Sequence, residues 1–143
     1  PVWRFQKHIH LLISCSTQKD LDEMAPVLFQ IPAAVRGVSF EPLIEELDMW
    51  SPRYALPSGG MGSAFAWGEG ARWVIVGCEK LVGNRPGRFC EDEARWWQAA
   101  RSLKEQCVAA GVAFYMKQGP LNGKVVTDPK DFPEDLRIRS YPK

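Results

Sequence analysis

The sequence predicts an α/β fold with a mainly parallel sheet of four or five strands and flanking helices. Four short apolar runs, rich in residues that favour β-strands, each stop abruptly on polar or charged residues. Strands that are buried on both faces of a parallel sheet read as continuous apolar runs of this kind. Helical patterns between the runs give the order of a sheet built by right-handed crossovers. The four runs are residues 10–16, 35–41, 73–80 and 112–118.

Length and charge narrow the class of protein. At 143 residues the chain fits a single domain over residues 1–143, with an irregular tail from about residue 128, where prolines alternate with charges. A net charge of +1 gives no global field toward nucleic acid or anionic lipid, so the charge does not indicate a nucleic-acid partner. No apolar stretch is long enough to span a membrane, and residues 1–7 lack the apolar core of a signal peptide. We therefore expect a cytoplasmic protein without a membrane partner.

The first strand is followed by a helix. Thr17 is suited to cap this helix, and Asp20 favours its positive amino end. The expected inward stripe is Leu21, Met24 and Leu28. Pro26 lies inside the pattern and lacks a backbone donor, so the helix is expected to be kinked or built from two short pieces.

The second strand, near 35–40, leads to an expected short helical turn at 44–49. Residues 50–70 are rich in proline and glycine and form the best loop candidate. Loops of this length in compact domains are usually functional or disordered. Its aromatic side chains would either pack the loop down or cover a ligand; they are Trp50, Tyr54, Phe65 and Trp67.

The clearest helix precedes the fourth strand. Acidic residues at 91–93 fill its first turn, apolar residues recur at helical spacing from Trp96 to Ala110, and Gly111 provides a left-handed stop. After the fourth strand, Asn122–Gly123 predicts a tight turn in a small hairpin.

Cysteine spacing argues against a metal site in this chain. The four cysteines lie far apart, with no Cys-x-x-Cys pair and no adjacent histidine. Cys15 and Cys78 fall in or at the ends of apolar strands, and Cys107 falls on the apolar face of a helix. We therefore expect buried, structural thiols.

The carboxyl ends of the parallel strands would bring several polar residues to one edge of the sheet, where α/β proteins place their ligands. Glu41 and Glu79, beside lysines, would suit acid–base chemistry if their pKa values were shifted. The alternative is a set of salt-bridged strand ends exposed to water, which spacing alone favours. The candidate ligand-binding residues are Ser14, Ser39, Glu41, Glu79, Lys80, Lys117 and Gln118.

Several blocks of this sequence resemble the carboxyl half of the phage-associated three-Cys-motif proteins, which are themselves similar to radical S-adenosylmethionine enzymes and have no settled function. The blocks are residues 32–36, 39–43, 73–79, 103–112 and 114–118. The resemblance implies a phage or bacterial-host protein with the fold of a partial, or half, TIM-type barrel. It also implies S-adenosylmethionine as a possible ligand.

The family's defining cysteine cluster, which by similarity would hold a four-iron cluster, has no counterpart here. Without it this chain alone is not expected to bind a cofactor for reductive cleavage of S-adenosylmethionine. Half a barrel also leaves two sheet edges to be covered. We therefore expect a homodimer through sheet edges or a separate cysteine-bearing partner chain.

These observations support two functional hypotheses. The first is a nucleotide-like small-molecule pocket at the strand ends of an uncharacterised phage-related protein. The alternative is a non-catalytic interaction module. A small hydrolase that uses Glu41 and Glu79 ranks last, because no nucleophile or metal set accompanies these residues.

Overall fold

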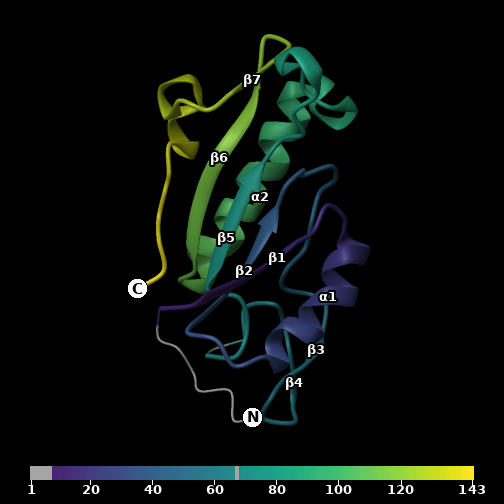
Figure 1. Cartoon of the computed structure of the whole chain (residues 1–143), viewed down its shortest axis with the longest axis vertical. Coiled ribbons are helices and arrows are strands. Elements are labelled where there is room, and N and C mark those ends of the chain that lie inside the picture. The colour runs from purple at the N-terminus through teal and green to yellow at the C-terminus, as the bar shows by residue number, and fades with distance from the viewer. Residues whose placement is uncertain (1–7, 67) are drawn as a thin grey trace.

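The computed structural model describes residues 8–66 and 68–143, and shows a five-stranded sheet in the order β1-β2-β5-β6-β7 (Figure 1). Residues 1–7 and Trp67 lie outside the described part. The strands are β1 (His10–Ser14), β2 (Val35–Phe40), β5 (Trp73–Gly77), β6 (Ala113–Leu121) and β7 (Lys124–Val126), with a separate pair β3 (Tyr54–Ala55) and β4 (Met61–Gly62). The helices are α1 (Gln18–Gln30) and α2 (Glu93–Ala110).

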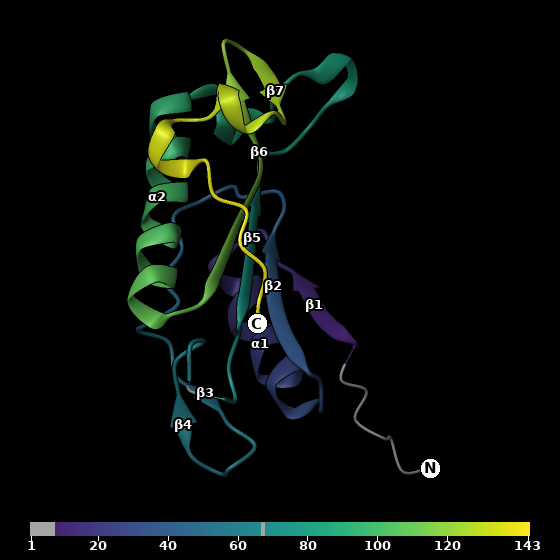
Figure 2. The ribbon, with the colours of Figure 1, turned by 90° about the vertical axis from the view of Figure 1, so that its left-hand side faces the viewer.

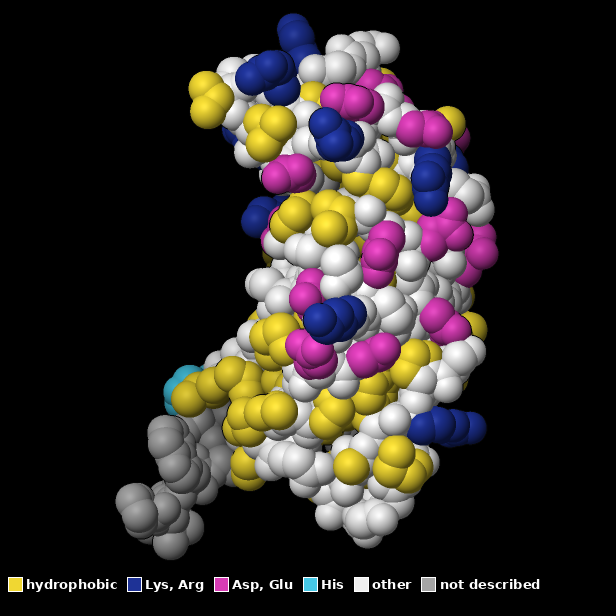
Figure 3. Space-filling view, turned by 90° about the vertical axis from the view of Figure 1, so that its right-hand side faces the viewer, with side chains coloured by type: hydrophobic (Ala, Val, Ile, Leu, Met, Phe, Trp, Pro, Cys, Tyr) yellow, Lys and Arg dark blue, Asp and Glu magenta, His cyan; other side chains and the backbone are white. Residues whose placement is uncertain are grey.

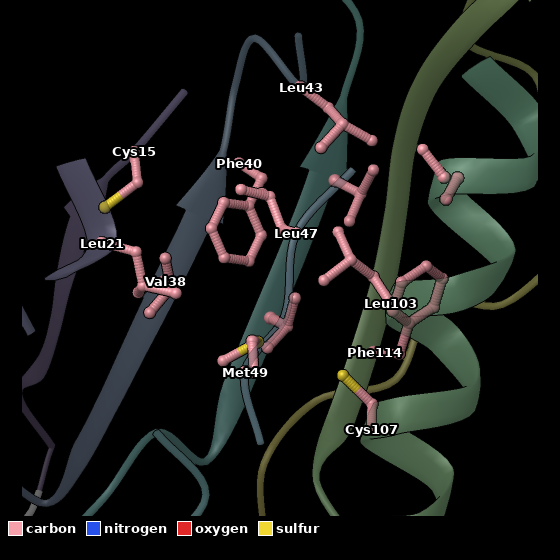
Figure 4. Close-up of a cluster of buried hydrophobic side chains, with 14 of the residues drawn as sticks. Cys15, Leu21, Val38, Phe40, Leu43, Leu47, Met49, Leu103, Cys107 and Phe114 are labelled. Carbon is pink, nitrogen blue, oxygen red and sulfur yellow. The ribbon is translucent and has the colours of Figure 1, made fainter. Parts of the chain in front are cut away.

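The sheet confirms the predicted α/β class. β1, β2, β5 and β6 are parallel to one another, and β7 pairs antiparallel with β6. The four parallel strands lie side by side in chain order. Right-handed crossovers that advance in one direction place their helices on one face of a sheet. α1 and α2 accordingly cover the same face (Figures 2 and 4).

The core lies between that face and the helices. Val38, Val74 and Phe114 stand in register on three neighbouring strands and are buried. Leu21 of α1 and Leu103 of α2 are fully buried in the same layer (Figure 4). Each side chain of this size contributes about 1.5–3 kcal/mol when it leaves water.

The start of α1 follows the sequence prediction. The Thr17 hydroxyl accepts a hydrogen bond from the Asp20 amide at 3.1 Å, and the Asp20 carboxylate accepts from the Ser16 and Thr17 amides at 2.9 Å. These backbone donors hold the pKa of Asp20 below its usual range. The helix continues through Pro26 as one element.

The inward stripe of α1 differs at one position from the prediction. Met24 is 39 % exposed, whereas Ala25 and Phe29 are fully buried. The buried stripe therefore runs through Leu21, Ala25 and Phe29, which follow one another at intervals of four residues. Met24 falls at the border of the stripe, beside Leu11 and Ile13 of β1.

The predicted helical turn at 44–49 is wrong, because this segment is not helical. Leu47 and Met49 are buried between the two helices. The side chain of Gln106, on α2, accepts from the Met49 amide at 2.8 Å and donates to the Leu47 carbonyl at 2.9 Å. A distant side chain thus supplies the hydrogen bonds that a local turn would otherwise make.

The 50–70 loop packs against the domain. The Tyr54 ring meets Phe29 edge-on, with centroids 5.9 Å apart, and its hydroxyl donates to Asp22 at 2.7 Å. Trp50 and Phe65 form a second aromatic pair with centroids 5.0 Å apart. The described aromatic residues of this loop therefore pack it down.

The second half of the chain contains the helix ends and the tight turn that were predicted from the sequence. Asp92 caps α2, and Gly111 ends it with a φ of 67°. Asn122 and Gly123 have φ values of 51° and 70°, as a tight hairpin turn requires. Within the described residues, no helix is both long and apolar enough to cross a membrane.

The tail after residue 128 forms two short 3₁₀ turns, Pro129–Asp131 and Glu134–Leu136, and then lies along β6. The Met116 amide donates to the Ile138 carbonyl at 2.8 Å, and the Ser140 amide donates to the Phe114 carbonyl at 2.9 Å. The tail therefore pairs with the outer edge of β6 in the manner of an additional short strand.

The Gln106 contacts generate a prediction for stability. Gln106→Ala removes two hydrogen bonds to the 47–49 segment, so we expect the free energy of unfolding in urea to fall by about 1–3 kcal/mol. Gln98→Ala, an exposed glutamine on the same helix, is the matched control and should change it by less than about 0.5 kcal/mol. Equal effects of the two variants would show that Gln106 does not hold this segment.

Candidate functional site

Among the described residues, neither α1 nor α2 covers the second face of the sheet, the open face. Ser39, Ile75 and Tyr115 stand in register on β2, β5 and β6 and share this face, because their neighbours in sequence point into the core. The molecule is hollowed on this side, as the left-hand outline of Figure 3 shows. Polar side chains lie at the carboxyl end of the face and aromatic side chains at its amino end.

Three of the predicted residues meet at the carboxyl end. The Ser39 hydroxyl donates to Glu41 Oε2 at 2.9 Å, and Lys117 Nζ lies 3.0 Å from Glu41 Oε1 and 3.1 Å from Oε2. Ser39 is buried, while the side chains of Glu41 and Lys117 are 20 % and 54 % exposed. One carboxylate is thus held between a buried hydroxyl and an accessible ammonium group.

Gly77, at the end of β5, allows this arrangement. A Cβ added to Gly77 would collide with Glu41 Oε1 and lie 3.0 Å from Glu41 Cγ. The Glu41 carboxylate therefore lies directly against the backbone of β5. The Gly77 carbonyl also accepts from the Leu43 amide at 2.9 Å, which fixes the chain just after Glu41. Gly77 was not among the residues predicted from the sequence, although a glycine at the end of a strand signals a close approach of this kind.

The other candidate residues lie outside the group formed by Ser39, Glu41 and Lys117. Ser14 is exposed at the end of β1, opposite Ser39 in register. The Gln118 side-chain Nε2 donates to the Cys78 carbonyl at 2.7 Å, next to a register shift between β5 and β6.

Glu79 packs against Gly87 in the following loop, and its carbonyl accepts from the Gly87 amide at 3.1 Å. Lys80 is exposed and forms an isolated bridge with Pro86. The structure therefore joins Ser39, Glu41 and Lys117, and directs Glu79 and Lys80 toward the 85–90 loop.

All four cysteines are free and buried. Interaction with the neighbouring Cys90 thiol, together with burial, raises the pKa of Cys78. Burial raises the pKa values of Cys15 and Cys107 to about 12. These three thiols are protonated at neutral pH and are poor nucleophiles. Among the described residues, no group of three His, Cys, Asp or Glu side chains is placed to hold a metal ion.

An aromatic cluster occupies the amino end of the open face. Trp73, Tyr115 and Tyr141 have ring centroids 5.5–6.3 Å apart, and Trp73 Nε1 donates to the Ser140 carbonyl at 3.1 Å. Arg139 lies over the Tyr115 ring, 5.4 Å from its centroid. These contacts hold the tail at the β6 edge, beside the amino end of the open face. In the sequence, alternation of side chains between the two faces of β5 and β6 was the signal that could have placed Trp73 and Tyr115 on the same face.

The comparisons place this chain in a family. The profile of DUF5131, described as a protein of unknown function, matches residues 2–131. The chain belongs to the DUF5131 family. Neither the curated proteins nor the solved structures gave a match. Membership of DUF5131 assigns no activity, so the function has to be argued from the open face itself.

The contact between Gly77 and Glu41 gives a second prediction. Gly77→Ala should displace the Glu41 carboxylate and lower the free energy of unfolding by about 1 kcal/mol. The same change in a Glu41→Ala background should cost less, since the colliding carboxylate is gone. Gly60→Ala, whose new Cβ would meet no atom closer than 3.9 Å, is the control in urea denaturation. An equal cost in both backgrounds would contradict the proposed contact.

Proposed function

We propose that this DUF5131 protein binds a small, polar, nucleotide-like ligand on the open face, at the carboxyl ends of β2, β5 and β6. The observation that carries the proposal is the Glu41 carboxylate, held against Gly77 between the Ser39 hydroxyl and the Lys117 ammonium group. An ordinary surface ion pair needs neither a close-approach glycine nor a buried hydroxyl. Both features fix the position of one carboxylate on an accessible face.

The chemistry of the three side chains favours a ligand with both donors and an anionic group. Glu41 accepts hydrogen bonds, which suits ribose hydroxyls or an ammonium group. Lys117 donates to phosphate or carboxylate oxygens. Partly exposed ion pairs contribute only about 0–1 kcal/mol, so a ligand can separate Lys117 from Glu41 at small cost. Ser39 keeps the carboxylate in place while Lys117 moves.

The neighbouring residues suit a planar ring. Ile75 lies between Ser39 and Tyr115 on the same face and is partly exposed, whereas the Tyr115 ring is already packed against Trp73, Tyr141 and Arg139. The apolar surface of Ile75 suits contact with a base, while the polar end holds the rest of the ligand. A nucleoside that carries a charged substituent would contact both ends.

S-adenosylmethionine is one such ligand, since it joins a nucleoside to an amino acid with one ammonium and one carboxylate group. We propose it on the resemblance to the carboxyl half of the phage-associated three-Cys-motif proteins. The chain-ordered parallel strands and the helices on one face also suit the wall of a partial barrel. The cysteines of this chain do not fit an iron–sulfur cluster, because among the described residues no three His, Cys, Asp or Glu side chains are placed to hold a metal ion, whereas a cluster takes four cysteine thiolates. We therefore assign this chain to ligand binding.

The alternative function, a non-catalytic interaction module, is favoured by a different observation. Within residues 8–66 and 68–143, β1 has no strand partner other than β2, and its free edge lies beside exposed apolar side chains. This surface is on the opposite side of β1 from β2, so both functions are compatible with one molecule.

Ligand binding is tested by thermal unfolding with S-adenosylmethionine, ATP and AMP, followed by calorimetric titration of any compound that stabilises the protein. At a hundredfold excess over Kd, a ligand of the native state adds about 2.7 kcal/mol of stability. We expect Glu41→Gln and Lys117→Met each to weaken binding at least tenfold. Each removes one charged contact, worth about 1.5–3 kcal/mol.

Glu46→Gln and Lys124→Met are the matched controls, because both residues are exposed and lie outside the three-residue group. They should leave the affinity unchanged. The proposal fails if none of the three compounds binds, or if the site variants and the controls bind equally well.

A further inference from the structure

The two edges of the sheet differ in how far other described segments of the chain cover them. At the β6 edge, β7 pairs with residues 119–121, and the tail pairs with residues 114–116. The chain's own segments therefore cover that edge along most of its length. Edge strands left unpaired are templates for pairing with another chain, and proteins usually protect them.

The β1 edge has no such cover among the described residues. β1 pairs with β2 alone. The Cys15 amide donates to the Ser39 carbonyl at 3.0 Å, so strand alternation directs the backbone of Leu11 and Ile13 toward β2. The backbone groups of His10, Leu12 and Ser14 consequently face outward. β1 contains no lysine, proline or bulge, the usual protections of an exposed edge.

An apolar groove lies beside this edge, between β1 and α1. It has a volume of about 230 Å³, and Glu23 is its one charged lining residue. Val27 is 62 % exposed, Met24 39 % and Ile31 42 %. Figure 3 looks onto this side of the molecule and shows hydrophobic side chains gathered at its lower left, beside a histidine. Contiguous apolar surface of this kind on a soluble protein marks an interaction site.

We propose that the occupant of this surface is a second copy of the chain, paired antiparallel through β1 about a two-fold axis at Leu12. In this register His10 opposes Ser14 of the second copy and Leu12 opposes itself. Those are the three residues whose backbone groups face outward, so every outward group gains a partner. An isologous contact needs a surface that is complementary to itself, and β1 meets this condition.

The helix layer supports the same arrangement. A two-fold axis perpendicular to the sheet keeps both α1 helices on one face, so the two grooves meet across the axis. Val27, Met24 and Ile31 of each copy would then leave water together. Glu23 has Lys19 3.8 Å away on its own helix, which limits charge repulsion at the contact. The result is a continuous ten-stranded sheet whose two open faces point the same way.

The test is light scattering coupled to size-exclusion chromatography over about 1–100 µM protein. We expect a dimer with twice the 16.1 kDa mass of the chain. Val27→Glu should weaken dimerisation at least tenfold, because it places two carboxylates at the axis. Val108→Glu is the matched control, since Val108 is 70 % exposed on α2, away from β1. Circular dichroism verifies that both variants are folded.

Amide exchange provides an independent readout. In the dimer, the amides of Leu12 and Ser14 should be protected, and Val27→Glu should accelerate their exchange while leaving Leu11 and Ile13 slow. A monomer at all concentrations, or a Val27→Glu dimer as tight as the Val108→Glu dimer, would overturn the proposal. A dimer with unprotected Leu12 and Ser14 amides would also overturn it, because another surface would then hold the two copies.

Discussion

The structure depends on one constraint: the four parallel strands follow one another in chain order, so their crossovers place both helices on a single face. Val38, Val74 and Phe114 are buried on that face, together with Leu21 and Leu103. A doubly wound sheet would cover its second face with helices as well. Here the second face is left to side chains with polar or aromatic groups.

The open face then explains features that the core does not need. Because Gly77 has no side chain, Glu41 can lie against β5. Lys117 contacts the same carboxylate from β6. At the other end of the face, Trp73 and Tyr115 hold the tail in place. The tail covers the β6 edge, whereas in the part of the chain that the structure describes no segment covers the β1 edge.

Local signals in the sequence predicted the parts of the fold that local chemistry determines. Thr17 and Asp20 cap α1, Gly111 ends α2, and Asn122–Gly123 turns the hairpin, each through contacts within a few residues. The four strands followed from apolar runs. The 44–49 segment was mispredicted because Gln106, about 60 residues later, supplies its hydrogen bonds.

The sequence predicted that the candidate residues lie at the ends of the strands, but not which of them contact one another. That Ser39, Glu41 and Lys117 meet depends on the register of β2, β5 and β6, and Glu79 turns away because Gly87 receives its carboxylate. Ligand binding on the open face is tested most directly by the ¹⁵N–¹H NMR spectrum during titration with S-adenosylmethionine or ATP. We expect chemical-shift changes concentrated at residues 39–41, 75–77 and 115–118. Shifts confined to α1 and α2, or no shifts at millimolar ligand, would contradict it.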